Sequence, residues 1–126
     1  MKIVPTAVTA KAYVKDSLRE IENGFSFELN NDFGAVTLTK VEPIKVDGQV
    51  WPVAAVSFVE RNGQVQKAAP ISKAKPYTIP KGTIQVRVQG LVVDAGPHEI
   101  TLTGLARGLG RIEVAFKDTI RQASRG

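Results

Sequence analysis

The chain has 126 residues and contains no cysteine. This length fits a single domain with a core of its own, and the lack of cysteine excludes a disulfide framework, a thiolate metal site and a cysteine nucleophile. The net charge of +5 is uneven, because residues 1–60 hold six Lys or Arg against eight Asp or Glu, whereas residues 61–126 hold eleven against four. A basic half is one reason to consider nucleic acid, but its charges are scattered, so we favour a solvated surface.

The start of the sequence, from Met1 to Pro5, has no apolar run as long as a signal peptide or a membrane span requires. We therefore expect a cytoplasmic protein that makes no membrane contact. Residues 1–12 mix small and β-branched residues, and two interpretations stay open: a short edge strand from Ile3 to Val8, or an arm whose order depends on docking.

A strand is predicted over residues 25–29, where Phe25, Phe27 and Leu29 alternate with polar residues. A period of two is typical of a strand with one buried and one solvated face. Asn23-Gly24 comes just before it, and both residue types accept positive φ, so the sequence predicts a hairpin here.

The register of this hairpin depends on the length of its loop. A three-residue loop over residues 22–24 pairs Ile21 with Phe25 and Glu20 with Ser26. A two-residue loop at Asn23-Gly24 instead puts carboxylates on the apolar face, and a slip of one residue moves every side chain to the other face. We therefore predict the three-residue loop.

Alternation and turn residues extend this pattern along the chain, with strand segments at residues 35–41, 44–46, 49–51, 54–60, 64–67, 84–89, 98–103 and 111–116, and predict about eight strands in all. The clearest central strand follows Lys81-Gly82, with Ile84, Val86 and Val88 on one face. Asp47-Gly48 and Asn62-Gly63 are expected turns. Three prolines in residues 68–80 predict a loop that crosses between sheets. The glycine-rich residues 104–110 predict a hairpin connection, and residues 118–126 a basic tail.

No stretch has sustained helical periodicity. We therefore predict an all-β fold, an antiparallel two-sheet β-sandwich of jelly-roll type, with about eight strands. Residues 1–126 form one domain, which includes the arm at 1–12 and the tail at 118–126.

The residues offer little catalytic chemistry. His98 is the only histidine, and a metal site would need two or three further ligands brought together, so we expect His98 to be structural. Glu20, Glu22 and Glu28 are expected to be solvated. We predict no catalytic, cofactor-binding or metal-binding residue on this chain.

Three aromatic residues, Phe33, Trp51 and Tyr77, fall beside predicted turns rather than in strand centres. Residues of this kind form the rim of a core, and they are also enriched at interfaces and around sugars. Both interpretations stay open.

Taken in order, several motifs resemble the small (beta) subunit of the bacterial C-glycoside deglycosidases. They are Asp16-Ser17-Leu18-Arg19, Glu22-Asn23-Gly24-Phe25-Ser26-Phe27-Glu28-Leu29, Val46-Asp47-Gly48, Tyr77-Thr78-Ile79-Pro80-Lys81-Gly82-Thr83 and Gly96-Pro97-His98-Glu99-Ile100. The resemblance covers about residues 13–118.

This resemblance implies an accessory subunit of a carbon–carbon lyase. Its partner would be a larger TIM-barrel alpha subunit that binds a divalent metal, usually manganese, and carries the acid–base residues. The complex would cleave the sugar–aglycone bond of 3-keto C-glycosides of flavonoids and related polyphenols by elimination, while the isolated chain stays inactive. Phe33, Trp51 and Tyr77 are then expected at or near the large-subunit contact.

Two other functions compete with this expectation. A stand-alone carbohydrate-binding β-sandwich would need a row of exposed aromatics on one sheet face, and the chain has few aromatics. A nucleic-acid-binding β-barrel is suggested by the basic half and would bind with a steep salt dependence. We expect neither nucleic-acid nor membrane binding.

Overall fold

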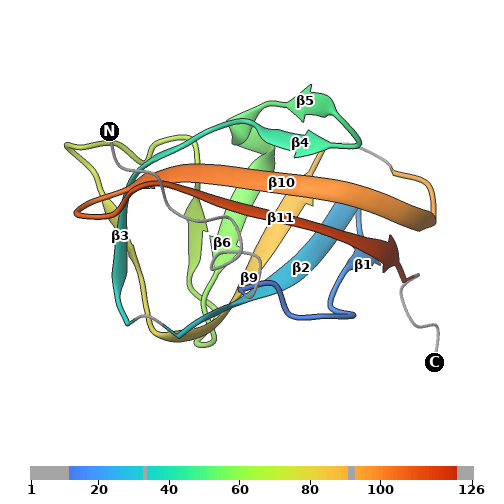
Figure 1. Ribbon diagram of the computed structural model, residues 1–126, viewed down its shortest axis with the longest axis horizontal. Helices are drawn as coiled ribbons and strands as arrows, with labels where there is room; N and C mark the ends of the chain where they lie inside the picture. The colour runs from blue at the N-terminus through green and yellow to red at the C-terminus, as the bar shows by residue number, and fades with distance from the viewer. Residues whose placement is uncertain (1–11, 33, 91–92, 122–126) are drawn as a thin grey trace.

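The computed structural model describes residues 12–32, 34–90 and 93–121. Over these residues, eleven strands form two antiparallel sheets that face each other and do not close into a barrel (Figure 1). The predicted all-β sandwich is confirmed, with eleven strands rather than about eight. In these ranges no helix has the length and apolar character needed to cross a membrane.

The five-stranded sheet has in its middle the strand that the sequence predicts after Lys81-Gly82. Its order is β1 (Arg19–Ile21), β2 (Gly24–Asn31), β9 (Gly82–Gln89), β6 (Val56–Val59) and β7 (Val65–Lys67). The apolar residues predicted for one face of β2 and β9 lie opposite each other, because Phe25 pairs with Val88 and Phe27 pairs with Val86. All four side chains are buried.

The six-stranded sheet is built around a long hairpin. Its order is β5 (Gln49–Trp51), β4 (Ile44–Val46), β10 (Gly96–Ala106), β3 (Val36–Val41) and β8 (Tyr77–Ile79), with β11 (Gly110–Ile120) on the other side of β10. β10 and β11 pair over their whole length, from Gly96 with Ile120 to Ala106 with Gly110. In Figure 1 this hairpin runs along the front of the five-stranded sheet.

The β4–β5 hairpin has the predicted bounds and turn. Val46 pairs with Gln49 across Asp47-Gly48, whose φ values are 52° and 82°. A two-residue type I′ turn needs a positive φ at both central residues, and its geometry matches the right-handed twist of the flanking strands. Asp-Gly adopts these φ values at low cost.

The predicted register of the first hairpin is wrong. Ile21 pairs with Gly24, and Glu20 pairs with Phe25. The loop is therefore two residues long, at Glu22 and Asn23, one position earlier than the two-residue loop considered above.

Gly24 explains this shift, because it belongs to β2 rather than to the turn. It lies opposite Gln89 of β9, and a Cβ there would lie 1.9 Å from the Val88 carbonyl oxygen. The argument from the apolar face also fails, because β1 is a short edge strand where Glu20 remains exposed.

The predicted connection at 104–110 is too long, because β10 continues through Ala106. Gly104 is a strand residue, and its ideal Cβ would lie 3.0 Å from the Lys40 carbonyl oxygen of β3. The glycine thus permits a close approach of two strands, next to a register shift after Leu105. The turn itself is Arg107 to Leu109.

The predicted tail over 118–126 is also wrong at its start, because β11 extends to Ile120. Arg121 forms a parallel bridge to Arg19, which joins the end of β11 to β1. The remaining residues of the tail, like those of the predicted arm up to 11, lie outside the described residues.

Residues 68–80 do cross from the five-stranded to the six-stranded sheet, but they include β8, which the sequence did not predict. Among the described strands, β8 pairs with β3 alone, as Leu38 opposite Tyr77 shows. Pro76 and Pro80 flank this edge strand, so neither removes a donor from a central ladder.

Candidate functional site

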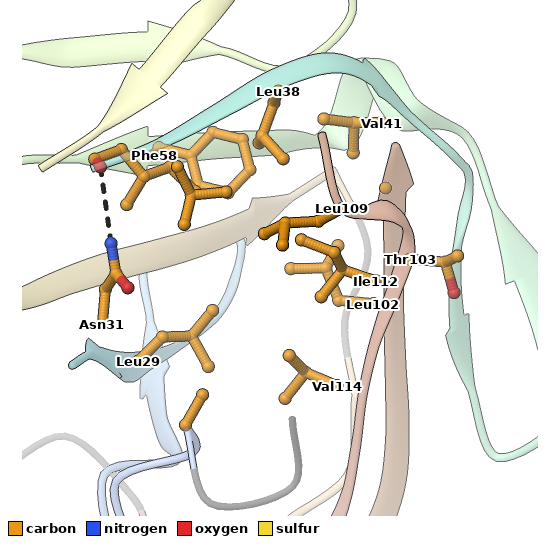
Figure 2. Close-up of a pocket in the computed structure, with 14 residues that line it drawn as sticks. Leu29, Asn31, Leu38, Val41, Phe58, Leu102, Thr103, Leu109, Ile112 and Val114 are labelled. Carbon is orange, nitrogen blue, oxygen red and sulfur yellow. Dashed lines mark hydrogen bonds between the residues drawn. The ribbon is translucent and has the colours of Figure 1, made fainter. Parts of the chain in front are cut away.

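An apolar pocket lies between the sheets, at the end of the sandwich nearest the β10–β11 turn (Figure 2). Both sheets supply its walls. The lining residues are Ala12, Leu29, Asn31, Val36, Leu38, Val41, Phe58, Ile79, Leu102, Thr103, Gly104, Leu109, Ile112 and Val114. The pocket has a volume of about 190 Å³.

The walls of the pocket offer hydrocarbon rather than hydrogen-bonding groups. Asn31 is one of two polar side chains there, and its Nδ2 donates to the carbonyl oxygens of Gly34 at 2.5 Å and Pro80 at 3.2 Å. Across the described residues, every buried side-chain nitrogen and oxygen has a hydrogen-bond partner. The site is therefore suited to binding by shape and apolar contact.

Sequence reasoning missed this pocket because its residues come from six strands, residue 12 and a turn. Strand alternation predicts which of these side chains face inward, but it does not predict whether the opposing side chains meet. The small residues at Ala12 and Gly104 are the only local signals, and neither is specific to a cavity.

The His98 side chain joins the β4–β5 turn to β10. Its Nδ1 lies 2.5 Å from Asp47 Oδ2, and its Nε2 lies 2.6 Å from the Asp94 carbonyl oxygen. Asp47 Oδ1 also accepts from the backbone N–H of Glu99 at 2.8 Å. Both ring nitrogens are thus used in structural contacts.

These contacts shift both pKa values in the direction that favours the charged pair. Burial lowers the pKa of His98, but its bonds to Asp47 and the Asp94 carbonyl outweigh this effect and raise the pKa above 6.5. The backbone N–H of Glu99, followed by His98, lowers the pKa of Asp47 below 3.8.

A second cluster links the segment before β1 to β11. The Tyr13 hydroxyl donates to Asp118 Oδ2 at 2.5 Å, and the Asp16 N–H donates to the same oxygen at 2.9 Å. The Tyr13 ring stacks on Phe116, with centroids 3.7 Å apart. Burial, together with the bond to Asp118, raises the pKa of Tyr13 to about 12.

The Asp118 carboxylate stays charged in this cluster. Burial raises its pKa, but hydrogen bonds from Tyr13, Thr119 and Asp16 outweigh burial and lower the pKa below 3.8. Asp118 therefore acts as an acceptor that ties the segment before β1 to β11.

Of the three predicted interface aromatics, the structure describes Trp51 and Tyr77 and does not place them on neighbouring strands. Trp51 is half-buried on β5, and Tyr77 lies on β8. These two strands are at opposite ends of the order β5-β4-β10-β3-β8. Tyr77 is 8% exposed, stacks on Phe58 and donates to Glu60 Oε2 at 2.9 Å, so it has little surface to offer a partner. Burial and the Glu60 bond raise its pKa. Phe33 lies outside the described residues, and an interface role for the three stays a prediction.

In the parts of the chain that the structure describes, no three His, Cys, Asp or Glu side chains are grouped so that they could hold a metal ion. The titratable side chains with shifted pKa values are the five described above. Each forms a hydrogen bond to a residue in a segment of the chain other than its own.

A protein-family model matches residues 8–121, and its description is hydroxymethylglutaryl-CoA reductase, N-terminal domain. The match spans most of the chain. A search of the curated proteins found no match.

The match overturns the resemblance to the small subunit of the C-glycoside deglycosidases, which was wrong. The motifs behind that resemblance are mostly turn sequences, such as Asn23-Gly24 and Asp47-Gly48, which many antiparallel sandwiches need for backbone reasons alone. The lyase, flavonoid and manganese expectations depended on that resemblance, and neither the fold nor the family match supports them.

Proposed function

This chain belongs to the family of hydroxymethylglutaryl-CoA reductase N-terminal domains, and we propose that it is a non-catalytic β-sandwich domain that works in one assembly with a larger catalytic partner. The family description supports the proposal, because it names a domain of an enzyme rather than a whole enzyme. It also makes the reduction of hydroxymethylglutaryl-CoA the first reaction to assay.

The observation that carries the proposal is the use of the ionisable side chains as links between segments. His98 and Asp47 join the β4–β5 turn to β10, and Asp118 joins β11 to Tyr13 and Asp16. General acid–base catalysis needs a group that is free to exchange a proton with a substrate. Side chains that are hydrogen-bonded to other segments instead hold the scaffold rigid.

Coexpression with candidate partners tests the proposal. The full chain is produced alone and with each of the proteins encoded beside it, and complex formation is followed by light scattering during gel filtration. Consumption of hydroxymethylglutaryl-CoA is followed by chromatography with a reductant present. We expect no turnover by the chain alone, a defined complex with one partner, and at least a tenfold higher turnover by that partner when the chain is bound.

A matched pair of variants adds the predicted interface to this test. Trp51→Ala removes the half-buried aromatic of β5, whereas Val50→Ala changes its exposed neighbour on the same edge strand. We expect Trp51→Ala to weaken the complex at least tenfold and Val50→Ala to leave it intact. Turnover by the isolated chain, or a chain that stays monomeric with every candidate and changes no activity, would contradict the proposal.

A further inference from the structure

We propose that the pocket between β2 and the β10–β11 hairpin binds a small uncharged hydrocarbon, of the size of one aromatic ring or a short branched alkyl chain. The inference depends on the pocket alone and is independent of the proposed assembly.

The lining determines the chemical class of the ligand. Leu102 and Val114 pair across the β10–β11 hairpin and lie beside each other on one wall of the space, whereas Leu29 and Phe58 line it from the five-stranded sheet (Figure 2). The buried polar atoms of the described residues are already paired, so a charged or strongly polar ligand would lose its hydration without gaining partners. An apolar ligand loses nothing of this kind and removes its own surface from water.

The volume determines the size of the ligand. At about 190 Å³, the pocket exceeds the roughly 150 Å³ of an apolar cavity in another protein that stays dry and binds benzene. A ring with one or two substituent carbons fills such a space. For a ligand of so few atoms we expect a dissociation constant on the order of 0.1–1 mM.

The pocket is accessible without unfolding of the sandwich. Leu109 forms part of its wall and is also 44% exposed, at the tip of the β10–β11 turn. Ala12 lies next to β2, where its carbonyl oxygen accepts from the Asn30 N–H, and its small side chain is only partly buried. Two residues of the lining are thus partly exposed, so the pocket is not sealed from the surface.

Methyl NMR on the full chain tests the site with toluene as the probe and benzoate as its charged counterpart. We expect saturable toluene shifts at the methyls of Leu29, Leu102 and Val114, no shift at the exposed Val65, and at least tenfold weaker binding of benzoate. Val114→Phe fills the pocket and should weaken toluene binding at least tenfold. Val50→Phe makes the same change on the exposed edge of β5 and should leave binding unchanged.

The fold of each variant is checked from its amide spectrum, and Ala12→Phe replaces Val114→Phe if the latter does not fold. Absence of toluene shifts, equal binding of benzoate, or undiminished binding by a folded filled variant would overturn the proposal. So would binding that appears only after Ile3, Val4 and Val8 are changed to serine, because the start of the chain would then be the occupant.

Discussion

The two ends of the space between the sheets are built by the same strands and packed differently. At one end, which we call the packed end, five apolar side chains are at most 1% exposed: Phe25, Phe27, Val86, Val88 and Ile100. At the pocket end, further along β2 and β10, four apolar side chains retain 6–8% exposure: Leu29, Leu38, Leu102 and Val114.

Ring volume accounts for the difference. Phe27 packs edge-on to Phe116 with centroids 5.0 Å apart, and Phe116 in turn stacks on Tyr13. The pocket end has Phe58 as its aromatic residue, with small residues at Ala12 and Gly104. Apolar alternation therefore directs side chains inward at both ends, but their volume decides where the interior is filled.

The largest expected effect contrasts truncations at the two ends. Phe27→Ala should destabilise the protein by about 3–5 kcal/mol, because it opens a cavity in a filled region. Leu102→Ala should cost about 2 kcal/mol, at the low end for such a change, because its side chain already faces open space. Urea unfolding measures both. Equal costs would remove the distinction between the two ends.

An added methyl group should show the same contrast with a smaller effect. Gly24→Ala places a Cβ 1.9 Å from the Val88 carbonyl oxygen, so backbone must move, at a cost of about 3 kcal/mol. Gly104→Ala meets the Lys40 carbonyl oxygen at 3.0 Å and Leu38 at 3.6 Å, beside the pocket, and should cost about 1 kcal/mol. Thermal unfolding compares them, and a larger loss for Gly104→Ala would contradict this account.

Removal of a tyrosine hydroxyl should cost more at the packed end. Tyr13→Phe deletes the bonds to the Asp118 carboxylate and the Leu18 N–H, for about 1.5–3 kcal/mol. Tyr77→Phe, the matched control on the ring that stacks on Phe58, loses one bond, to the Glu60 carboxylate, and should cost less, about 1.5 kcal/mol at the low end of the same range. Urea midpoints at pH 7 give both values, and the reverse order would argue against Asp118 as a link.

The smallest effect is a pH dependence from His98 and Asp47, where β10 begins. Because the pKa of His98 is raised in the folded state, its protonation stabilises the folded protein. This contribution is complete below pH 6.5 and is lost as the pH rises through the folded-state pKa. The lowered pKa of Asp47 means stabilisation that is present above pH 3.8 and is lost as pH falls through its folded-state pKa. The pair should therefore contribute most between pH 3.8 and 6.5.

His98→Gln tests this pH dependence through urea midpoints from pH 5 to 8.5. The wild-type midpoint should decline above pH 6.5 relative to that of the variant, and the effect should be small because Asp47 is half-exposed. Parallel curves for the two proteins would show that the pair does not contribute.

Local chemistry explains which parts of the fold the sequence could predict. Asp47-Gly48 has its own reason to turn, and the predicted β4–β5 pairing is confirmed. Asn23-Gly24 looks equivalent, but Gly24 is needed beside Val88 of β9, a contact that no local pattern contains. Gly104 was likewise interpreted as a turn residue, although it permits the approach of β3.

The pocket could not be predicted for the same reason. Alternation correctly places Leu29 and Val114 on inward faces, but the distance between opposing faces depends on residues from both sheets. The placement of Trp51 and Tyr77 on strands that are not neighbours also depends on the order of strands in the sheet, which local patterns do not contain.

A crystal structure determined under xenon pressure tests most directly the claim that only one end of the interior is open. Xenon enters dry apolar cavities of this size. The account predicts a xenon atom among Leu29, Leu102 and Val114 and none beside Phe27. An empty pocket end, or equal xenon occupancy at both ends, would contradict it.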